Sequence, residues 1–474
     1  MNDITAFFAF LKYCLGYKEN MSRVIAGMNW HELYSFASKQ ALLGLCFEGI
    51  ERLGEEYPEE LKQNPIGREL LMTWMGKAQQ IRRQNMKVNA VASKLFSMLR
   101  VDGMRCCILK GQGNALMYPN PYFRTPGDID VWIDASRERI MEYASKKFEL
   151  GDDIRLQHLE TSLDGVPVEL HFFPCSMNNP IYHARLQKWF RRNADLQCSH
   201  IVGLPDEAGD IAIPTTAFNV VYQLCHLYHH FFDEGIGMRQ IIDYFLVVND
   251  FSKNVFLDTY FLKQQDNYSK ITPSLFTLKE GSTSHPDPLS SGAREETALR
   301  CSEPLRYKDG GPSKVSPDCA GWDRLDAIGA SKPSPNCAGW DRLAIEGDNS
   351  TTVVTSSAST ALDVVQRELK YLGLWKFSGA VMYVLHEALG LPEEKMIAPM
   401  DEKRGKLLLA EILNGGNFGK HFTKYGHFTQ QGMAKKYFLK IWRNMHFVRY
   451  YPAEALSEPI FRTWHFFWRL KHRR

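Results

Sequence analysis

The sequence predicts an α+β protein in which a small mixed sheet lies between helical N-terminal and C-terminal regions, with a long disordered insert. Apolar residues recur at helical spacing over residues 1–102, and short apolar runs with strand-like alternation follow over 103–205. Helical spacing returns over 206–263 and again over 361–474. Between these two parts, residues 264–360 are rich in Ser, Pro, Gly, Asp and Thr and lack an apolar period. These five segments are the predicted organisation of the chain.

Composition and charge favour an ordinary globular protein. The 474 residues are 44% apolar, which is enough for real cores, and a net charge of +3 does not suggest a protein that coats nucleic acid. Ten cysteines occur without a CxxC motif, which fits a reducing compartment. The N-terminus has no basic segment, and Lys12 interrupts its apolar stretch, so neither a signal peptide nor a transmembrane segment is expected. We therefore expect a soluble cytoplasmic protein.

The N-terminal region is predicted to consist of helices. Asn29 stands directly before a run with helical apolar spacing, where an N-cap is expected. The last helix of the region should run from Gly67 to Leu99. It should end at Asp102-Gly103, because glycine readily adopts the left-handed conformation that terminates helices.

The central region is predicted to alternate strands and helices. In the run 165–172, Glu169 and His171 share one face of a strand, while Val168 and Leu170 share the other. The predicted elements are a strand over 105–109, a helix over 111–118, a strand over 128–133, a helix over 137–148 and a strand over 165–172.

Helices are predicted on both sides of the insert, which therefore interrupts one helical region. They cover 215–228 and 236–248 before it, and 361–389, 402–414 and 433–451 after it. The terminal residues 460–474 alternate aromatic and basic side chains. We expect a terminal helix that packs its aromatic residues on the domain, with weak contact to a membrane surface or a polyanion as the alternative.

The insert contains a tandem repeat. Residues 316–325 (SPDCAGWDRL) recur with one change as residues 334–343 (SPNCAGWDRL). Two copies are too few for a solenoid, so a duplication explains them better than a binding module does. A metal clip formed by the two cysteines is the alternative, but it lacks the further ligands of a zinc site. The insert is expected to be dispensable for folding.

Asp128 and Asp130 are the most informative residues of the central region. They alternate with Ile129 and Val131, so strand geometry places both carboxylates on one face. Carboxylates crowded in this way repel each other unless a cation lies between them, and oxygen ligands favour Mg²⁺ or Mn²⁺ over Zn²⁺. A glycine-flanked loop at 110–113 precedes them. The pattern predicts a metal site for phosphoryl chemistry.

Several motifs carry a resemblance to a known family. They are LKGQG at 109–113, RTPGDID at 124–130 and VELH at 168–171, supported by WHEL at 30–33, GMRQIID at 237–243, His226 and His230. In these residues the chain resembles the uncharacterised bacterial nucleotidyltransferases of the polymerase-beta-like superfamily. The resemblance extends over most of the chain except the insert.

The resemblance implies a nucleotidyltransferase palm over 103–205 and a set of catalytic residues. In this superfamily, two acids on one strand and a third on a neighbouring strand hold two divalent ions. This implies Asp128, Asp130 and Glu169 as catalytic residues and metal ligands, with Mg²⁺ or Mn²⁺ as cofactor. It also implies a nucleoside triphosphate such as ATP as substrate and an unidentified acceptor that bears a hydroxyl group.

The resemblance further implies residues that bind the nucleotide. Gly111 and Gly113 would let backbone N–H groups approach the triphosphate, and Lys110 or Arg124 would neutralise charge on pyrophosphate. The family usually has Gly or Ser next to the first glycine, whereas Gln112 stands there in this chain.

Three further groups of polar residues have structural explanations. We expect His171 to be a hydrogen-bonded histidine beside the site rather than a ligand. His226, His229 and His230 are expected to form hydrogen bonds with Asp233 nearby, rather than a metal site. Arg239 and Asp243 are expected to form an ion pair within one helix.

The predicted reaction is the transfer of a nucleoside monophosphate from a triphosphate to an acceptor hydroxyl, with release of pyrophosphate. One alternative is a catalytically silent scaffold that only binds a nucleotide. Another is an accessory protein of the membrane surface that uses residues 460–474.

Overall fold

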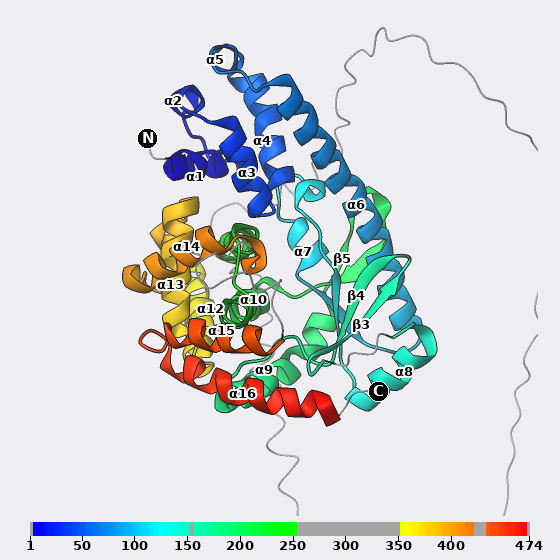
Figure 1. Ribbon diagram of the computed structural model, residues 1–474. Coiled ribbons are helices and arrows are strands. Elements are labelled where there is room, and N and C mark those ends of the chain that lie inside the picture. The colour runs from blue at the N-terminus through cyan, green and yellow to red at the C-terminus, as the bar shows by residue number, and fades with distance from the viewer. Residues whose placement is uncertain (1–2, 151–154, 254–350, 421–432, 472–474) are drawn as a thin grey trace, which may run out of the picture. The chain divides into compact units, whose positions relative to one another are not determined.

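The computed structural model describes residues 3–150, 155–253, 351–420 and 433–471 (Figure 1). The predicted α+β class is confirmed: a small mixed sheet lies in the chain between helical regions. Residues 264–350 of the predicted insert, and with them the tandem repeat, lie outside the described residues. No helix in the described ranges has the length and apolar character needed to cross a membrane.

The N-terminal region consists of helices, as predicted. They are α1 (Asp3–Cys14), α2 (Ser22–Ala26), α3 (Trp30–Lys39), α4 (Leu43–Glu56), α5 (Pro58–Gln63) and α6 (Arg68–Val101). The side chain of Asn29 caps α3 by accepting the backbone N–H of Glu32. The long helix α6 ends at Asp102, and Gly103 follows with φ of +70°, so the predicted end of this helix is confirmed.

A four-stranded sheet has the order β1-β2-β4-β3. Its strands are β1 (Cys106–Leu109), β2 (Ile129–Ile133), β3 (His158–Leu163) and β4 (Val166–His171). Strands β2 and β4 are parallel, whereas the other two pairs are antiparallel. Strand β3, which was not predicted, forms a tight hairpin with β4. A separate two-stranded sheet pairs β5 (Ile201–Gly203) with β6 (Asp210–Ala212).

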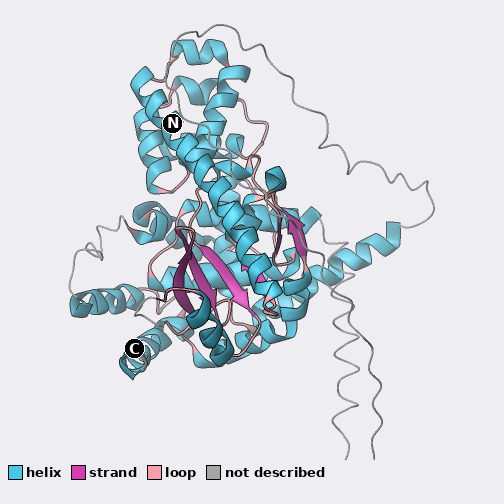
Figure 2. Ribbon diagram, turned by 90° about the vertical axis from the view of Figure 1, so that its right-hand side faces the viewer, coloured by secondary structure: helices cyan, strands magenta, loops and turns pink. Residues whose placement is uncertain are grey.

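The two faces of the main sheet contact different helices. The alternation of β2 sends Ile129, Val131 and Ile133 into a core that includes residues of α6, which lies along the sheet (Figure 2). On the other face, Trp132 packs against aromatic rings of α9 (Pro180–Ser199) and α10 (Thr216–Asp233), among them Phe218. Asp130 alternates with the first set and therefore lies on the α10 face. Helix α8 (Arg137–Lys147) contributes to the α6 core.

The helical segments on the two sides of the insert share one core. A helix over residues 238–253 follows α10, and the later elements are α12 (Thr351–Tyr371), α13 (Trp375–Leu389), α14 (Glu402–Gly415), α15 (Met433–Met445) and α16 (Pro452–Lys471). Tyr228 and Phe231 of α10 contact Phe377 of α13 and Tyr451, which precedes α16. Segments separated by the insert in the sequence are thus packed together.

Several predicted boundaries are wrong. Helix α12 begins at Thr351, so residues 351–360 are helical although they were assigned to the insert. The predicted helix 361–389 is two helices, α12 and α13, separated at Gly373 with φ of +75°. Strand β2 begins at Ile129, one residue after Asp128. The terminal helix begins at Pro452 rather than at residue 460.

The elements that connect the strands and long helices are short. The helix predicted over 111–118 is the single turn α7 (Gly111–Ala115). Four 3₁₀ turns, η1 (Pro121–Phe123), η2 (Pro205–Glu207), η4 (Glu393–Lys395) and η5 (Asn417–Gly419), lie in connections between described elements.

Candidate active site

The parallel pairing of β2 and β4 brings two of the predicted acids together. Asp130 lies directly opposite Glu169 in the register of these strands, so their side chains leave the sheet on the same face. Asp128 precedes β2 by one residue and is the more exposed of the two aspartates. Leu109, the last residue of β1, pairs with Asp130 from the other side. The loop that begins at Lys110 therefore starts beside the acids.

Asp130 is buried and held by two basic groups. Its Oδ2 lies 3.1 Å from Nζ of Lys110, and its Oδ1 lies 3.0 Å from Nε2 of His171. Burial alone would raise the pKa of Asp130, but Lys110 and His171 hold this pKa well below its usual range. Asp130 is therefore an ionised carboxylate with both oxygens engaged.

Asp128 has the opposite electrostatic environment. Desolvation, together with the nearby carboxylates of Asp130 and Glu169, raises the pKa of Asp128 to about 6. Lys110 offsets only part of this effect. Three carboxyl groups thus repel one another, and a cation of higher charge than one lysine would relieve this repulsion.

Glu169 completes the group of acids and contacts two histidines. Its Oε2 lies 3.2 Å from Nε2 of His171 and 3.3 Å from Nδ1 of His158. Burial alone would lower the pKa of His171, but its bonds to Asp130 and Glu169 raise that pKa to about 9. His171 is a hydrogen-bonded histidine beside the acids, as predicted.

The loop after β1 directs Lys110 toward the acids. Lys110 has φ of +52° and Gly111 has φ of +41°, and such values are unusual for a residue with a side chain. Nζ of Lys110 also donates to Nε2 of His226 on α10, at 2.7 Å. Gly113 is buried, and a Cβ there would meet Ile213 at 3.0 Å, so close packing explains this glycine.

Two of the three histidines of α10 are hydrogen-bonded to each other, which is part of the predicted group. Nε2 of His230 lies 3.1 Å from Nε2 of His226. Asp233 instead pairs with Lys440, at 2.8 Å, and with Arg462, at 2.9 Å. The carboxylate of this group is therefore occupied by two cations, which agrees with a structural explanation.

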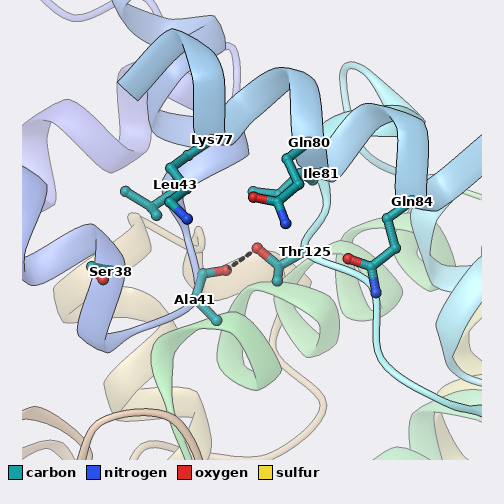
Figure 3. Close-up of a pocket in the computed structure, with 8 residues that line it drawn as sticks. All are labelled: Ser38, Ala41, Leu43, Lys77, Gln80, Ile81, Gln84 and Thr125. Carbon is teal, nitrogen blue, oxygen red and sulfur yellow. Dashed lines mark hydrogen bonds between the residues drawn. The ribbon is translucent and has the colours of Figure 1, made fainter. Parts of the chain in front are cut away.

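The loop that leads to Asp128 is fixed from three sides. Nδ2 of Asn85, on α6, donates to the backbone carbonyls of Tyr122 and Arg124, each at 2.8 Å. The hydroxyl of Thr125 donates to the carbonyl of Ala41 at 2.7 Å (Figure 3). Gly44 allows the close approach of this loop, because a Cβ there would lie 2.2 Å from the carbonyl oxygen of Phe123. The position of Asp128 thus depends on the N-terminal helices.

Two arginines lie on the third side of this loop. Nε and Nη2 of Arg124 donate to the two carboxylate oxygens of Asp243, at 2.8 and 2.7 Å, and the hydroxyl of Tyr118 donates to the same residue. The predicted pairing of Arg239 with Asp243 is therefore replaced by a longer-range pair. Nη1 of Arg239 donates to the carbonyl of Thr125 at 3.0 Å. Arg239 is buried, and within the described ranges it forms no salt bridge.

A pocket of about 220 Å³ is lined by residues of the N-terminal helical region and by Thr125 of the same loop (Figure 3). Lys77, Gln80 and Gln84 of α6 point into it, and Thr125 forms part of its wall. A second pocket, of about 480 Å³, is lined by residues between Ala26 and Leu70. None of the three acids lines either pocket.

Two residues near the acids were not identified from the sequence. His158 lies on β3, which was not predicted. Its contact with Glu169 could be predicted only if the pairing of this strand with β4 was recognised. The alternation of His158, Glu160 and Ser162 with less polar residues, before a turn at Asp164-Gly165, was a usable signal. The position of Arg239 beside Thr125 had no comparable signal, because it joins residues 114 positions apart.

Comparison with protein families identifies the chain. Residues 26–271 match the model of a family described as uncharacterised nucleotidyltransferase. Comparison with curated proteins and with solved structures finds no match. The matched residues include all of the acids, the Lys110 loop and the helix that carries Arg239, and they span more than half of the chain. This protein therefore belongs to the uncharacterised nucleotidyltransferase family.

Proposed function

We propose that the protein transfers a nucleoside monophosphate from a nucleoside triphosphate to an acceptor hydroxyl, with release of pyrophosphate. Membership of the family supports nucleotidyl transfer in general. The observation that supports this reaction most strongly is the convergence of Asp128, Asp130 and Glu169, because the two neighbouring carboxylates add to desolvation in raising the pKa of Asp128 to about 6. Such a group of carboxylates fits divalent cations.

The donor set suits Mg²⁺ or Mn²⁺, and Asp128, Asp130 and Glu169 would hold these ions. When bound, they would supply positive charge to the attacking and leaving oxygens of the phosphoryl group. Glu169, or a water that it orients, is proposed to accept the proton of the acceptor hydroxyl. Lys110 is proposed to stabilise charge on the leaving pyrophosphate, because its ammonium group already lies beside Asp130.

Arg124 and Arg239 have different proposed roles. Arg124 is bound bidentately by Asp243, so it would mainly hold the loop before Asp128 in place. Arg239 lies beside the same loop, is buried, and forms no salt bridge with a carboxylate in the described part of the chain. A triphosphate would attract this guanidinium, so we add Arg239 to the proposed phosphate contacts together with Gly111.

Pyrophosphate release tests this function. The protein is incubated with each labelled triphosphate, a divalent cation and a cell extract that supplies acceptors, and the labelled product is identified. The reaction should require the cation and should be lost in Glu169→Gln. Asp164→Asn is the matched control, because Asp164 is exposed and its positive φ is well tolerated by Asn. Nucleotide binding without any cation-dependent release would instead favour the silent scaffold.

A membrane-surface role is favoured by one feature of α16. Ile460, Trp464, Phe466 and Phe467 are each about half or more exposed. Arg462 on the same helix pairs with Asp233, so part of the helix is attached to the rest of the protein, but the prediction that the aromatic residues pack on the domain is wrong for Trp464, Phe466 and Phe467. Sedimentation with anionic vesicles, compared between the full chain and a Trp464→Ala, Phe467→Ala variant, tests this role. Equal sedimentation of both proteins would contradict it.

A further inference from the structure

We propose that His158, Glu169 and His171 form a site for a transition-metal ion of the zinc class, distinct from the oxygen-only pair Asp128 and Asp130. The inference is related to the proposed function only through Glu169, which both sites share. Imidazole nitrogen is a good ligand for Zn²⁺, Co²⁺ and Ni²⁺ and a poor one for Mg²⁺. The site with the two histidines would therefore select a different ion from the one that Asp128 and Asp130 hold.

The distances from Glu169 to the two histidines match the ligand spacing around one tetrahedral ion. Oε2 of Glu169 lies 3.2 Å from Nε2 of His171 and 3.3 Å from Nδ1 of His158, and each of the three residues offers one ligand atom within 4.8 Å of those of the other two. Ligands at about 2.0–2.1 Å from a tetrahedral zinc ion are separated by about 3.3–3.4 Å. A cation can thus enter with small side-chain adjustments.

The β3–β4 hairpin explains why these residues meet. His158 lies directly opposite His171, and Glu160 lies directly opposite Glu169, in the antiparallel register. Residues directly opposite each other project from the same face of the sheet. The two imidazole rings are 5.0 Å apart between centroids, and Glu169 lies two residues from His171 on the same strand. The ligands therefore come from two adjacent, rigid strands.

The bonding of His158 points to a missing ligand. The residue is 8% exposed, and neither ring nitrogen forms a hydrogen bond with any residue that the structure describes. A buried imidazole that lacks hydrogen bonds is unfavourable unless another partner is present. Oε1 of Glu160 lies 3.8 Å beyond Nε2 of His158. Metal-bound histidines commonly direct their second nitrogen at such a carboxylate.

His171 would exchange one interaction for another. Its Nε2 now lies within hydrogen-bonding distance of Asp130 and Glu169, and the same nitrogen would become the ligand. Behind it, the side-chain amide of Gln157 lies 3.3 Å from Nδ1 and by turning over would accept the proton of that nitrogen. Asp130 stays next to the site and adds negative charge that favours a divalent ion.

Cobalt binding tests this site without any nucleotide. The full-length protein is freed of metal with a chelator and titrated with Co²⁺ in the presence of excess Mg²⁺. We expect the intense visible absorption of four-coordinate Co²⁺, removed by Zn²⁺ in competition but not by Mg²⁺. His158→Ala should weaken Co²⁺ binding at least tenfold, and Glu160→Gln should weaken it less. His31→Ala, at an exposed histidine on α3, is the matched control.

Two results would overturn the proposal. One is equal Co²⁺ affinity in the wild type and His158→Ala, and the other is a spectrum of six-coordinate Co²⁺ that Mg²⁺ abolishes. If His158→Ala does not fold, His158→Gln gives the same test with a side chain of similar size. Asp128→Asn should keep the cobalt spectrum, because Asp128 is not a ligand of this site. Loss of nucleotidyl transfer in Asp128→Asn would therefore not imply loss of this site.

Discussion

The ammonium group of Lys110 lies 3.1 Å from Oδ2 of Asp130, and it reaches this position from a backbone conformation with φ of +52°. A residue with a Cβ in such a conformation is strained by roughly 1–3 kcal/mol. The strain persists because the contacts with Asp130 and with His226 hold the side chain in place. The chain thus maintains a costly backbone geometry at the point where one cation meets the acids.

Lys110→Met should reduce kcat/KM about 100-fold, which corresponds to roughly 2.7 kcal/mol of transition-state stabilisation. Methionine keeps most of the length of the side chain but removes the charge beside Asp130. Initial rates of pyrophosphate release measure the effect. Lys94→Met is the control, because Lys94 pairs with Asp164 in a salt bridge whose side chains are both about half exposed. Comparable losses in both variants would argue against a specific role for Lys110.

Asp128→Asn and Asp130→Asn should each lower activity about 100-fold or more while the protein stays folded. Each change removes a charge that the proposed cations require and preserves the size of the side chain. Circular dichroism and thermal unfolding report folding, and pyrophosphate release reports activity. The assignment of these residues as metal ligands fails if both variants keep most of their activity.

Glu454 should make stability depend on pH. It is buried, its carboxylate accepts the backbone N–H groups of Asn178 and Asn179, and burial raises the pKa of Glu454 to about 7, with the nearby Glu458 adding to the effect. A raised pKa in the folded state means that the stabilisation is complete below the unfolded pKa of about 4.5 and is lost as pH rises through about 7.

Urea unfolding at pH 5 and pH 8 measures this effect. The free energy of unfolding of the wild type, relative to Glu454→Gln, should fall on the order of 3 kcal/mol between the two pH values. The glutamine at position 454 cannot ionise, whereas all other titrating groups are the same in both proteins. Subtracting the value of the variant from that of the wild type therefore isolates the effect of Glu454. A difference between the proteins that is the same at both pH values would contradict the raised pKa.

The insert should be removable if the cut respects the start of α12. A short Gly-Ser linker from Lys263 to Thr351 should leave the melting temperature nearly unchanged, because loop-closure free energy changes by only about 0.6 kcal/mol per doubling of loop length. A linker to Ala361 removes ten residues of α12 and should lower the melting temperature. If the two deletions prove equally stable, the first turns of α12 contribute nothing.

The sequence predicted the parts of the site that depend on local pattern. Asp130 and Glu169 were recognised because period-two alternation is visible within a few residues, and it assigns them to one face of their strands. The end of α6 was recognised for the same reason, since Gly103 is adjacent to it. Strand alternation and the glycine that ends a helix depend on residues adjacent in the sequence, so a single sequence reveals them.

Contacts between distant residues were not predictable in this way. Spacing of four residues suggested a pair between Arg239 and Asp243, but Asp243 accepts two hydrogen bonds from Arg124, which is 119 residues away. Asp243 is bound bidentately by Arg124 rather than by the arginine four residues away on its own helix, and the sequence does not show which partner will be adjacent. The start of α12 was missed because the polar composition of residues 351–360 resembles that of the insert.

The contact between Lys110 and His226 joins residues separated by 116 positions. Contacts of such long range form late in folding, since the closure of a long loop must precede them. The environment of Lys110 is therefore incomplete until α10 docks on the sheet. Under the proposed function, in which Lys110 takes part, a nascent or refolding chain would remain inactive until most of its tertiary structure exists, and recovery of activity would serve as a stringent kinetic marker of complete folding.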